Sequence, residues 1–232
     1  RQIEASPRRI EHRISGQQPA FARLTCPESS LVLRVLDRGE EESLLSLISL
    51  EHKLWQERVE TPSVGSDVLI FAELSPSVSA GGFTETKLLD GVVQMNRGGA
   101  RIDHGPGQLT AFLIRSLADT DPADYLKSFQ RILRGAVLRL GIDPETARDF
   151  VKVGLTVKSK VSMHGAFIDL AGPSGEIISL ATHYQPGMND VKESFILSLM
   201  TEFKYNGVSV LSSVPGNNTV REPELQLAGG WG

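Results

Sequence analysis

The residues best suited to chemistry lie in one segment, residues 97–108, which reads RGGARIDHGPGQ. It holds four glycines, a proline, two arginines and a histidine, between apolar runs that are typical of strands. Glycine tolerates positive φ and lets the backbone approach a bound molecule closely. Beside Arg97 and His104, this glycine content indicates a loop that holds a ligand. The alternative is structural: His104 caps a tight turn, and Arg97 braces the loop through carbonyl groups.

A second segment, Ser162-Met163-His164-Gly165-Ala166, places a His-Gly pair in an apolar strand. A histidine in such a strand is more often a structural residue than a catalyst, and that alternative stays open for His164. The histidines show no metal-ligand spacing, and the single cysteine, Cys26, excludes an internal disulfide and a thiolate metal cluster. We therefore expect neither a metal nor a cofactor.

These two segments need a sheet to bring them together, and the hydrophobic pattern predicts one. It predicts strands over residues 31–36, 67–73, 91–95, 109–114, 151–155, 161–170 and 177–181. It predicts helices over residues 42–58, from Asp121 to Gly141 and from Asp190 to Gly207, with residues 75–82 as a loop. The mixture indicates an α+β fold, in which a mixed β-sheet packs with helices. We assign residues 1–29 to a basic N-terminal extension, 30–207 to the domain and 208–232 to an irregular tail.

The composition is that of a globular protein, with 40% hydrophobic and 22% charged residues among 232 and a net charge of −4. The length fits a single domain with a sizeable core. The net charge argues against a protein that binds nucleic acid over its whole surface. No apolar run approaches the length of a membrane span, so we expect no membrane partner.

The first 23 residues carry five arginines against two glutamates. An arginine-rich, acid-poor stretch resembles the end of a mitochondrial transit region, so we expect a mitochondrial location. The alternative is a solvated basic arm, which could also contact RNA or an acidic partner.

The two glycine-containing segments resemble those of the lipoate/octanoate transferase family, whose members are relatives of biotin protein ligases. The family's best-known stretch reads roughly Arg-Gly-Gly-x-x-Thr-Tyr-His-Gly-Pro-Gly-Gln. Its counterparts here, in order and without gaps, are Arg97, Gly98, Gly99, His104, Gly105, Pro106, Gly107 and Gln108. A second family stretch, a Gly-Leu pair followed by a His-Gly pair on a strand, matches Gly154-Leu155 and His164-Gly165.

The resemblance implies a biotin/lipoate protein ligase-like catalytic domain, in which the matched residues wall a pocket for a medium-chain acyl group. It also implies an activity, the transfer of an octanoyl or lipoyl group from an acyl carrier protein to a lysine of a lipoyl domain. In the octanoyltransferase branch, a cysteine forms a thioester and a lysine acts as general acid and base. That pairing is chemically sensible, because a thiolate is a good acyl acceptor and a nearby ammonium group favours the thiolate.

The sequence departs from the family at both catalytic positions. The family cysteine lies in a Pro-Cys-Gly turn, whereas Ser174 stands in the comparable turn here and comes too early in the chain. The family lysine corresponds to Asp149. The nearest lysine, Lys152, lies three residues along, and such a step reverses the face of a strand. Ser174 and Lys152 remain as catalytic candidates, but neither combines the family's residue type with its position.

We therefore expect a lipoyl(octanoyl) transferase-like protein that has lost acyl-transfer activity and acts as a binding or scaffold component of a mitochondrial assembly, such as a ribosomal or ribosome-assembly particle. Its partners are then proteins of a larger complex, with RNA as a further partner for the basic arm. The alternative is an active transferase with acyl carrier protein and lipoyl domains as partners. In that alternative, Ser174 or Cys26 acts with Lys152 or Lys158.

Overall fold

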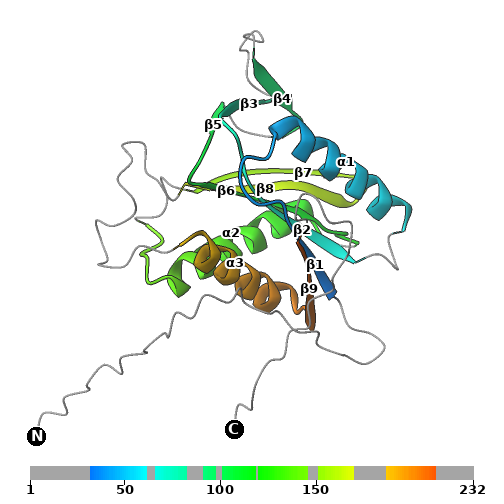
Figure 1. Cartoon of the computed structure of the whole chain (residues 1–232). Coiled ribbons are helices and arrows are strands. Elements are labelled where there is room, and N and C mark those ends of the chain that lie inside the picture. Colours follow the sequence, from blue (N-terminus) through cyan, green and yellow to red (C-terminus); the bar gives the residue numbers. More distant parts are fainter. Residues whose placement is uncertain are drawn as a thin grey trace, which may run out of the picture.

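A six-stranded mixed sheet forms the centre of the molecule (Figure 1). The computed structural model describes residues 32–61, 66–82, 91–97, 101–118, 120–145, 151–169 and 187–212. The strand order is β7-β8-β6-β2-β1-β9. The strands are β1 (Val32–Asp37), β2 (Asp67–Glu73), β6 (Gln108–Ile114), β7 (Val151–Lys158), β8 (Val161–Asp169) and β9 (Gly207–Ser212). Strand β1 runs parallel to β2 and β9, whereas the pairs β2–β6, β6–β8 and β7–β8 are antiparallel.

A smaller sheet carries the beginning of the glycine-rich segment. Its strands, in the order β4-β3-β5, are β4 (Val92–Met95), β3 (Ser77–Gly81) and β5 (Ile102–His104). Two sequence predictions are wrong here, because residues 77–81 form a strand rather than a loop and the glycine-rich segment itself contains β5. Serine, alanine and glycine fill most of β3, so no alternation of large apolar and polar residues marks it.

The helices cover both faces of the large sheet (Figure 1). Helix α1 (Leu44–Glu60) packs on one face, and α2 (Pro122–Arg139) lies beside α3 (Met188–Phe203) on the other. The predicted α+β architecture, with a mixed sheet between helices, is confirmed. No helix in the described ranges is both long and apolar enough to cross a membrane.

Helix α2 follows the sequence pattern closely. The Asp121 carboxylate caps it by accepting the Ala123 N–H at 2.8 Å, and Pro122 occupies the first turn. One apolar stripe faces the sheet, as expected for an amphipathic helix. Its buried members are Tyr125, Phe129, Ile132, Leu133, Ala136 and Val137.

Helix α3 both begins and ends before the residues predicted for it. Asp190 is its third residue rather than its cap, and its carboxylate accepts the Gly187 N–H at 2.8 Å. The helix ends before Lys204, which has a φ of 58°, and Gly207 belongs to β9. The prediction of an irregular tail is wrong for residues 208–212, because they pair with β1. The strand predicted over residues 177–181 lies outside the described residues.

Two apolar cores lie on the two faces of the large sheet. The first, beneath α2 and α3, includes Phe71, Phe129 and Phe195. The second, beneath α1, includes Phe112 and Phe167. Strands β2 and β6 are covered on both faces, which explains why their sequences are continuous apolar runs.

A buried carboxylate, Asp67, joins four parts of the chain at one end of the sheet. Its Oδ1 accepts Arg58 Nη2 of α1 and the backbone N–H of Ser116, each at 3.2 Å. Its Oδ2 accepts Arg115 Nη1 at 2.6 Å and the Tyr205 hydroxyl at 2.7 Å. Asp67 is only 2% exposed, so these bonds replace the water that its carboxylate loses on folding.

We predict that Asp67→Asn lowers the free energy of unfolding by about 3–5 kcal/mol, because it removes the buried negative charge that faces the Arg58 and Arg115 guanidinium groups. Chemical denaturation followed by circular dichroism measures the change. The matched control is Asp124→Asn, which removes an exposed ion pair with Lys127 and should leave stability nearly unchanged. Equal stability of the two variants would show that the Asp67 network does not hold the fold.

A second prediction concerns Gly165 in β8. A Cβ atom at this position would lie 2.0 Å from the carbonyl oxygen of Ala111 in β6, a contact that neither backbone can relieve locally. Gly165→Ala should therefore lower the free energy of unfolding by more than about 4 kcal/mol or prevent folding. Gly82→Ala is the control, because nothing lies within 4 Å of its added Cβ. A stable Gly165→Ala protein would contradict the close pairing of β6 and β8.

Candidate functional site

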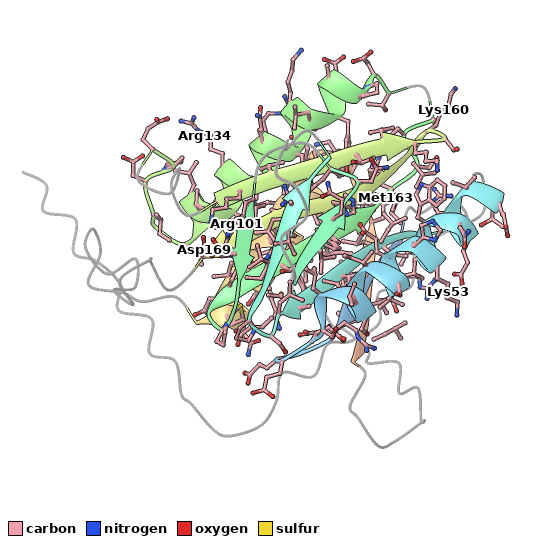
Figure 2. The ribbon with its side chains drawn as sticks, turned by 90° about the horizontal axis from the view of Figure 1, so that it is seen from above. Lys53, Arg101, Arg134, Lys160, Met163 and Asp169 are labelled. Carbon is pink, nitrogen blue, oxygen red and sulfur yellow. The ribbon has the colours of Figure 1, made fainter. Side chains whose placement is uncertain are left out.

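The glycine-rich segment meets β7 and β8 on the α1 face of the large sheet. Gln108 begins β6 and pairs in register with Asp169, which ends β8. Lys152 of β7 pairs with Phe167, a member of the core beneath α1. Directly paired residues of antiparallel strands project to the same face. Gln108, Asp169 and Lys152 therefore share the α1 face. Figure 2 shows Asp169 at the end of β8 remote from Lys160.

Hydrogen bonds link the buried polar side chains at this edge. Arg97 Nη2 donates to the Ser79 hydroxyl at 2.9 Å, and that hydroxyl lies 2.8 Å from His104 Nε2. His104 Nδ1 lies 2.6 Å from Oε1 of Gln108. All four residues are less than 9% exposed, so this part of the network is closed to bulk water.

The network continues outward to the surface of β7. Gln108 Nε2 donates to Asp169 Oδ1 at 2.5 Å, and Asp169 Oδ2 lies 3.3 Å from Lys152 Nζ. The Lys152 side chain is 44% exposed, so the network ends in solvent. We call these connected residues the polar chain: Arg97, Ser79, His104, Gln108, Asp169 and Lys152.

The amide of Gln108 fixes the direction of the bonds in the polar chain. Its Nε2 donates to the carboxylate of Asp169 and to the carbonyl of Asp103, so its oxygen is the atom that faces His104. An amide oxygen only accepts hydrogen bonds, and Nδ1 of His104 therefore carries the proton. Nε2 of His104 keeps a lone pair, which accepts the Ser79 O–H. Both ring nitrogens of His104 are occupied.

The surroundings of His104 favour this neutral form. Burial lowers the pKa of His104, and the positive charges of Arg97 and Lys152 lower it further. The hydrogen bond to Gln108 and the charge of Asp103 act in the opposite direction without reversing the shift. A neutral imidazole with both nitrogens paired cannot take a proton from a substrate unless a bond of the polar chain breaks.

Part of the glycine-rich motif is explained by turn geometry. The N–H of Gln108 donates to the carbonyl of Gly105 at 3.2 Å, which closes a four-residue turn between β5 and β6. Gly107, third in the turn, has a φ of 82°, and Pro106 precedes it. Proline followed by a residue with positive φ is the signature of a type II turn. The turn brings His104 at the end of β5 close to Gln108 at the start of β6, although the two strands belong to different sheets.

Arg97 packs its alkyl part against a glycine of β7. A Cβ at Gly154 would lie 2.7 Å from Cδ of Arg97, so the absence of a side chain at residue 154 makes room for the arginine. This contact connects the Gly154-Leu155 pair to the glycine-rich segment. Arg97 also donates to the Ser79 carbonyl at 3.4 Å, in agreement with the structural alternative in which it braces the loop through carbonyl groups.

His164 is buried against α1 and pairs with a glutamate of that helix. Its Nδ1 lies 2.7 Å from Oε2 of Glu51, and its backbone N–H donates to Oε1 of the same carboxylate. The ring also lies edge-on to Phe112, with 5.5 Å between ring centroids. His164 is 2% exposed and Glu51 is 0% exposed. Both matched histidines thus lie on the α1 face, His164 in a pair with Glu51 and His104 in the polar chain.

The structure places some of the predicted site residues and leaves others undescribed. Arg97, His104 and Gln108 meet in the polar chain, next to the Gly105–Gly107 turn. Lys152 lies on the site face, because it pairs in register with Phe167; that it faces away from residue 149 stays a prediction. Gly98, Gly99, Asp149 and Ser174 lie outside the described residues, as does Cys26.

Three residues of the site were not among the sequence candidates. Ser79 lies in a segment predicted as a loop, and Glu51 is one of several glutamates on α1. Asp169 stands where asparagine is usual in the family that the sequence resembles. Its carboxylate forms the ion pair with Lys152. Among the residues that the structure describes, no group of three or more His, Cys, Asp or Glu side chains could hold a metal ion.

Comparison with known proteins finds relatives of the chain in sequence and in fold. No protein-family model matches the chain. An octanoyltransferase of Nocardia farcinica is 33% identical over 137 residues, which cover 50% of this chain and 54% of that protein, so the match spans about half of the relative. An octanoyltransferase of Dictyoglomus turgidum is 24% identical over 216 residues, which cover 78% of this chain and 91% of that protein.

Solved structures share the fold at low sequence identity. Lipoate-protein ligase A bound with ATP has a TM-score of 0.57 and 13% identity, over 84% of this chain and 90% of that one. The bipartite lipoate protein ligase of Thermoplasma acidophilum, described with its E2 lipoyl domain, has a TM-score of 0.56 and 14% identity, over 80% and 88%. The chain is thus similar in sequence to octanoyltransferases and in fold to lipoate-protein ligases.

Proposed function

We propose that this chain is a lipoyl/octanoyl transferase-like protein that has lost acyl transfer and acts as a binding or scaffold component of a larger assembly. The observation that carries the proposal is the polar chain. Three of its members, Arg97, His104 and Gln108, belong to the glycine-rich motif, and here they bond one another through Ser79 or directly. His104 has no free nitrogen, and Lys152 is held by Asp169.

The two catalytic positions support the same conclusion. Acyl transfer through a thioester needs a thiolate and a group that moves its proton. Ser174 replaces the thiol with a hydroxyl, which has a far higher pKa than a thiol and is a poor nucleophile without an adjacent base. Asp149 replaces the ammonium group with a negative charge, which disfavours any nearby anionic nucleophile.

The composition of the first 23 residues supports a mitochondrial location for this role. Five arginines against two glutamates fit a matrix-targeting or RNA-contacting arm. We propose protein partners in a mitochondrial particle, of the ribosomal or ribosome-assembly kind, with RNA as a second contact for the arm.

One structural observation favours a second candidate, an active transferase with displaced machinery. Lys152 lies on the site face and its positive charge acts on His104, so an ammonium group is present where a lysine general acid could work. In this alternative the substrates are an octanoyl-acyl carrier protein and a lysine of a lipoyl domain. The comparison structure of a ligase described with its E2 lipoyl domain is consistent with that substrate class.

A transfer assay separates the two candidates. The purified chain is incubated with octanoyl-acyl carrier protein and an apo lipoyl domain, and intact mass spectrometry follows both the chain and the lipoyl domain. We predict no acyl adduct on the chain and no octanoylation above the reaction without it, because in the described part of the chain both nitrogens of His104 are bonded and Lys152 is paired with Asp169. An active octanoyltransferase, such as the Nocardia relative, serves as positive control.

Octanoylation above background would overturn the proposal if Ser174→Ala or Lys152→Ala abolishes it. Lys127→Ala is the matched control, because Lys127 also forms an ion pair with an aspartate but lies on α2, on the opposite face of the sheet. Sedimentation of the protein from a mitochondrial extract then tests the scaffold role. The proposal expects migration with a large particle, and migration as a free 25 kDa chain would contradict it.

A further inference from the structure

The outer side of helix α2 carries a stripe of positive charge. Lys127, Arg131 and Arg134 are spaced by four and by three residues, so they lie on one face of the helix, and all three are exposed. Like charges at these spacings weaken a helix. The whole chain has a net charge of −4, so the stripe is a local concentration of cations. The stability of α2 does not explain it.

Acidic side chains neutralise only part of this stripe. Lys127 pairs with Asp124 at 2.9 Å, and Arg131 pairs with Glu202 of α3 at 2.6 Å. Arg134 forms neither an ion pair nor a hydrogen bond with the residues that the structure describes. The two ion pairs are exposed, and exposed pairs are weak and screened by salt. The three cations therefore remain available to a partner of negative charge.

A groove of about 620 Å³ lies beside the stripe, between α2 and the start of β7. We call it the basic groove. The three cations of the stripe line it together with Glu145, and its apolar lining comes from Leu133, Val137 and Val151. Leu133 and Val137 belong to the core beneath α2, so they form a fixed floor. A volume of this size is typical of sites that hold a small molecule or a few side chains of a partner.

Exposed leucines surround the groove. Three of the four large hydrophobic side chains that are exposed in the described ranges lie on α2 and α3: Leu126 (39%), Leu138 (54%) and Leu197 (41%). Leu138 follows Arg134 by four residues and so extends the stripe along the same face of α2. A solvated helix face would account for the charges alone. Leucines and arginines around an apolar groove are instead typical of a surface that binds another protein.

We propose that the basic groove docks an acidic amphipathic helix of a protein partner. Carboxylates of that helix pair with the stripe, above all with Arg134, and its apolar side chains enter the groove against Leu133 and Val137. The inference rests on the proposed scaffold role, because it assigns a surface and a chemistry to one partner. Helix α2 lies on the face of the sheet opposite to α1, so the groove is separate from the polar chain.

Two other occupants fit the groove less well. RNA would gain nothing from the apolar floor, and no aromatic side chain lines the groove for a base to stack on. The carboxylates of Glu145 and Glu202 would also repel its phosphates. In a symmetric dimer formed through this surface, the same patch of both copies would meet, and the two basic stripes would repel each other.

The test uses a fluorescent synthetic helix of about 18 residues, or five turns, with leucines on one face and glutamates on both sides of that face. Fluorescence anisotropy measures its binding to the full chain. We expect saturable binding that Arg134→Glu weakens by at least about tenfold and that Leu138→Ser also weakens. The control is Lys53→Glu, which makes the same change of charge at an exposed residue of α1. Figure 2 shows Lys53 and Arg134 on opposite sides of the sheet.

Four results would overturn the inference. The first is no binding of the peptide, and the second is equal weakening by Arg134→Glu and Lys53→Glu, which would indicate attraction to charge anywhere on the surface. The third is tighter binding of a single-stranded RNA, lost in Arg134→Glu, which would make the groove an RNA site. The fourth is a dimer in sedimentation velocity that Arg134→Glu dissociates, which would assign the groove to a second copy of the chain. Circular dichroism checks that each variant is folded.

Failure of the proposed function and failure of this inference are distinguishable. Octanoyl transfer in the mass assay, or migration of the unsubstituted protein as a free chain, would contradict the proposed function, whatever the peptide does. Peptide binding that does not depend on Arg134 would contradict the docking surface, even if the protein migrates with a large particle and transfers no acyl group.

Discussion

The orientation of one amide, that of Gln108, determines what the site can do. Its nitrogen faces a carboxylate and a carbonyl, so its oxygen must face His104. The proton of His104 then lies on Nδ1, and its remaining lone pair is taken by Ser79. The imidazole of His104, which could transfer protons in another setting, therefore links the two sheets here through its bonds to Ser79 and Gln108. Asp169 extends the same constraint to Lys152, because its two oxygens accept from the amide and face the ammonium group.

Two buried carboxylates, Asp67 and Glu51, connect the helices and strands around the site. Asp67 joins α1, β2, the end of β6 and the segment after α3, and Glu51 joins α1 to β8. Both are buried; Asp67 accepts hydrogen bonds through both oxygens, and Glu51 accepts the His164 N–H through Oε1 with its Oε2 2.7 Å from Nδ1 of the ring. Together with the close pairing at Gly165, they fix β8 relative to α1 and β6. The site is thus held by rigid elements, whatever its present chemical role.

Much of the fold could be predicted because apolar periodicity marks it. Strand β2 and helix α2 were predicted closely from an unbroken apolar run and from an amphipathic stripe with an aspartate cap. Strands β3 and β5 could not be, because small residues fill most of β3, β5 is only three residues long, and their pairing with each other and with β4 makes them strands. Strand β9 carries Val208 and Val210, which join the core beneath α2 and α3, and it pairs along the edge of β1. The face of His164 was unpredictable for a different reason, since it depends on a single left-handed residue.

The proposed loss of activity depends on the polar groups of the family motif being held in hydrogen bonds within the polar chain. The protonation of His104 tests this most directly. A pH series of long-range ¹H–¹⁵N spectra reports both nitrogens of its ring. The account predicts one neutral tautomer, with the proton on Nδ1, that persists below the ordinary histidine pKa of about 6.5. This expectation follows from burial and from the charges of Arg97 and Lys152, which lower the pKa of His104. A proton on Nε2 at neutral pH, or a ring that titrates at or above the ordinary value, would contradict it.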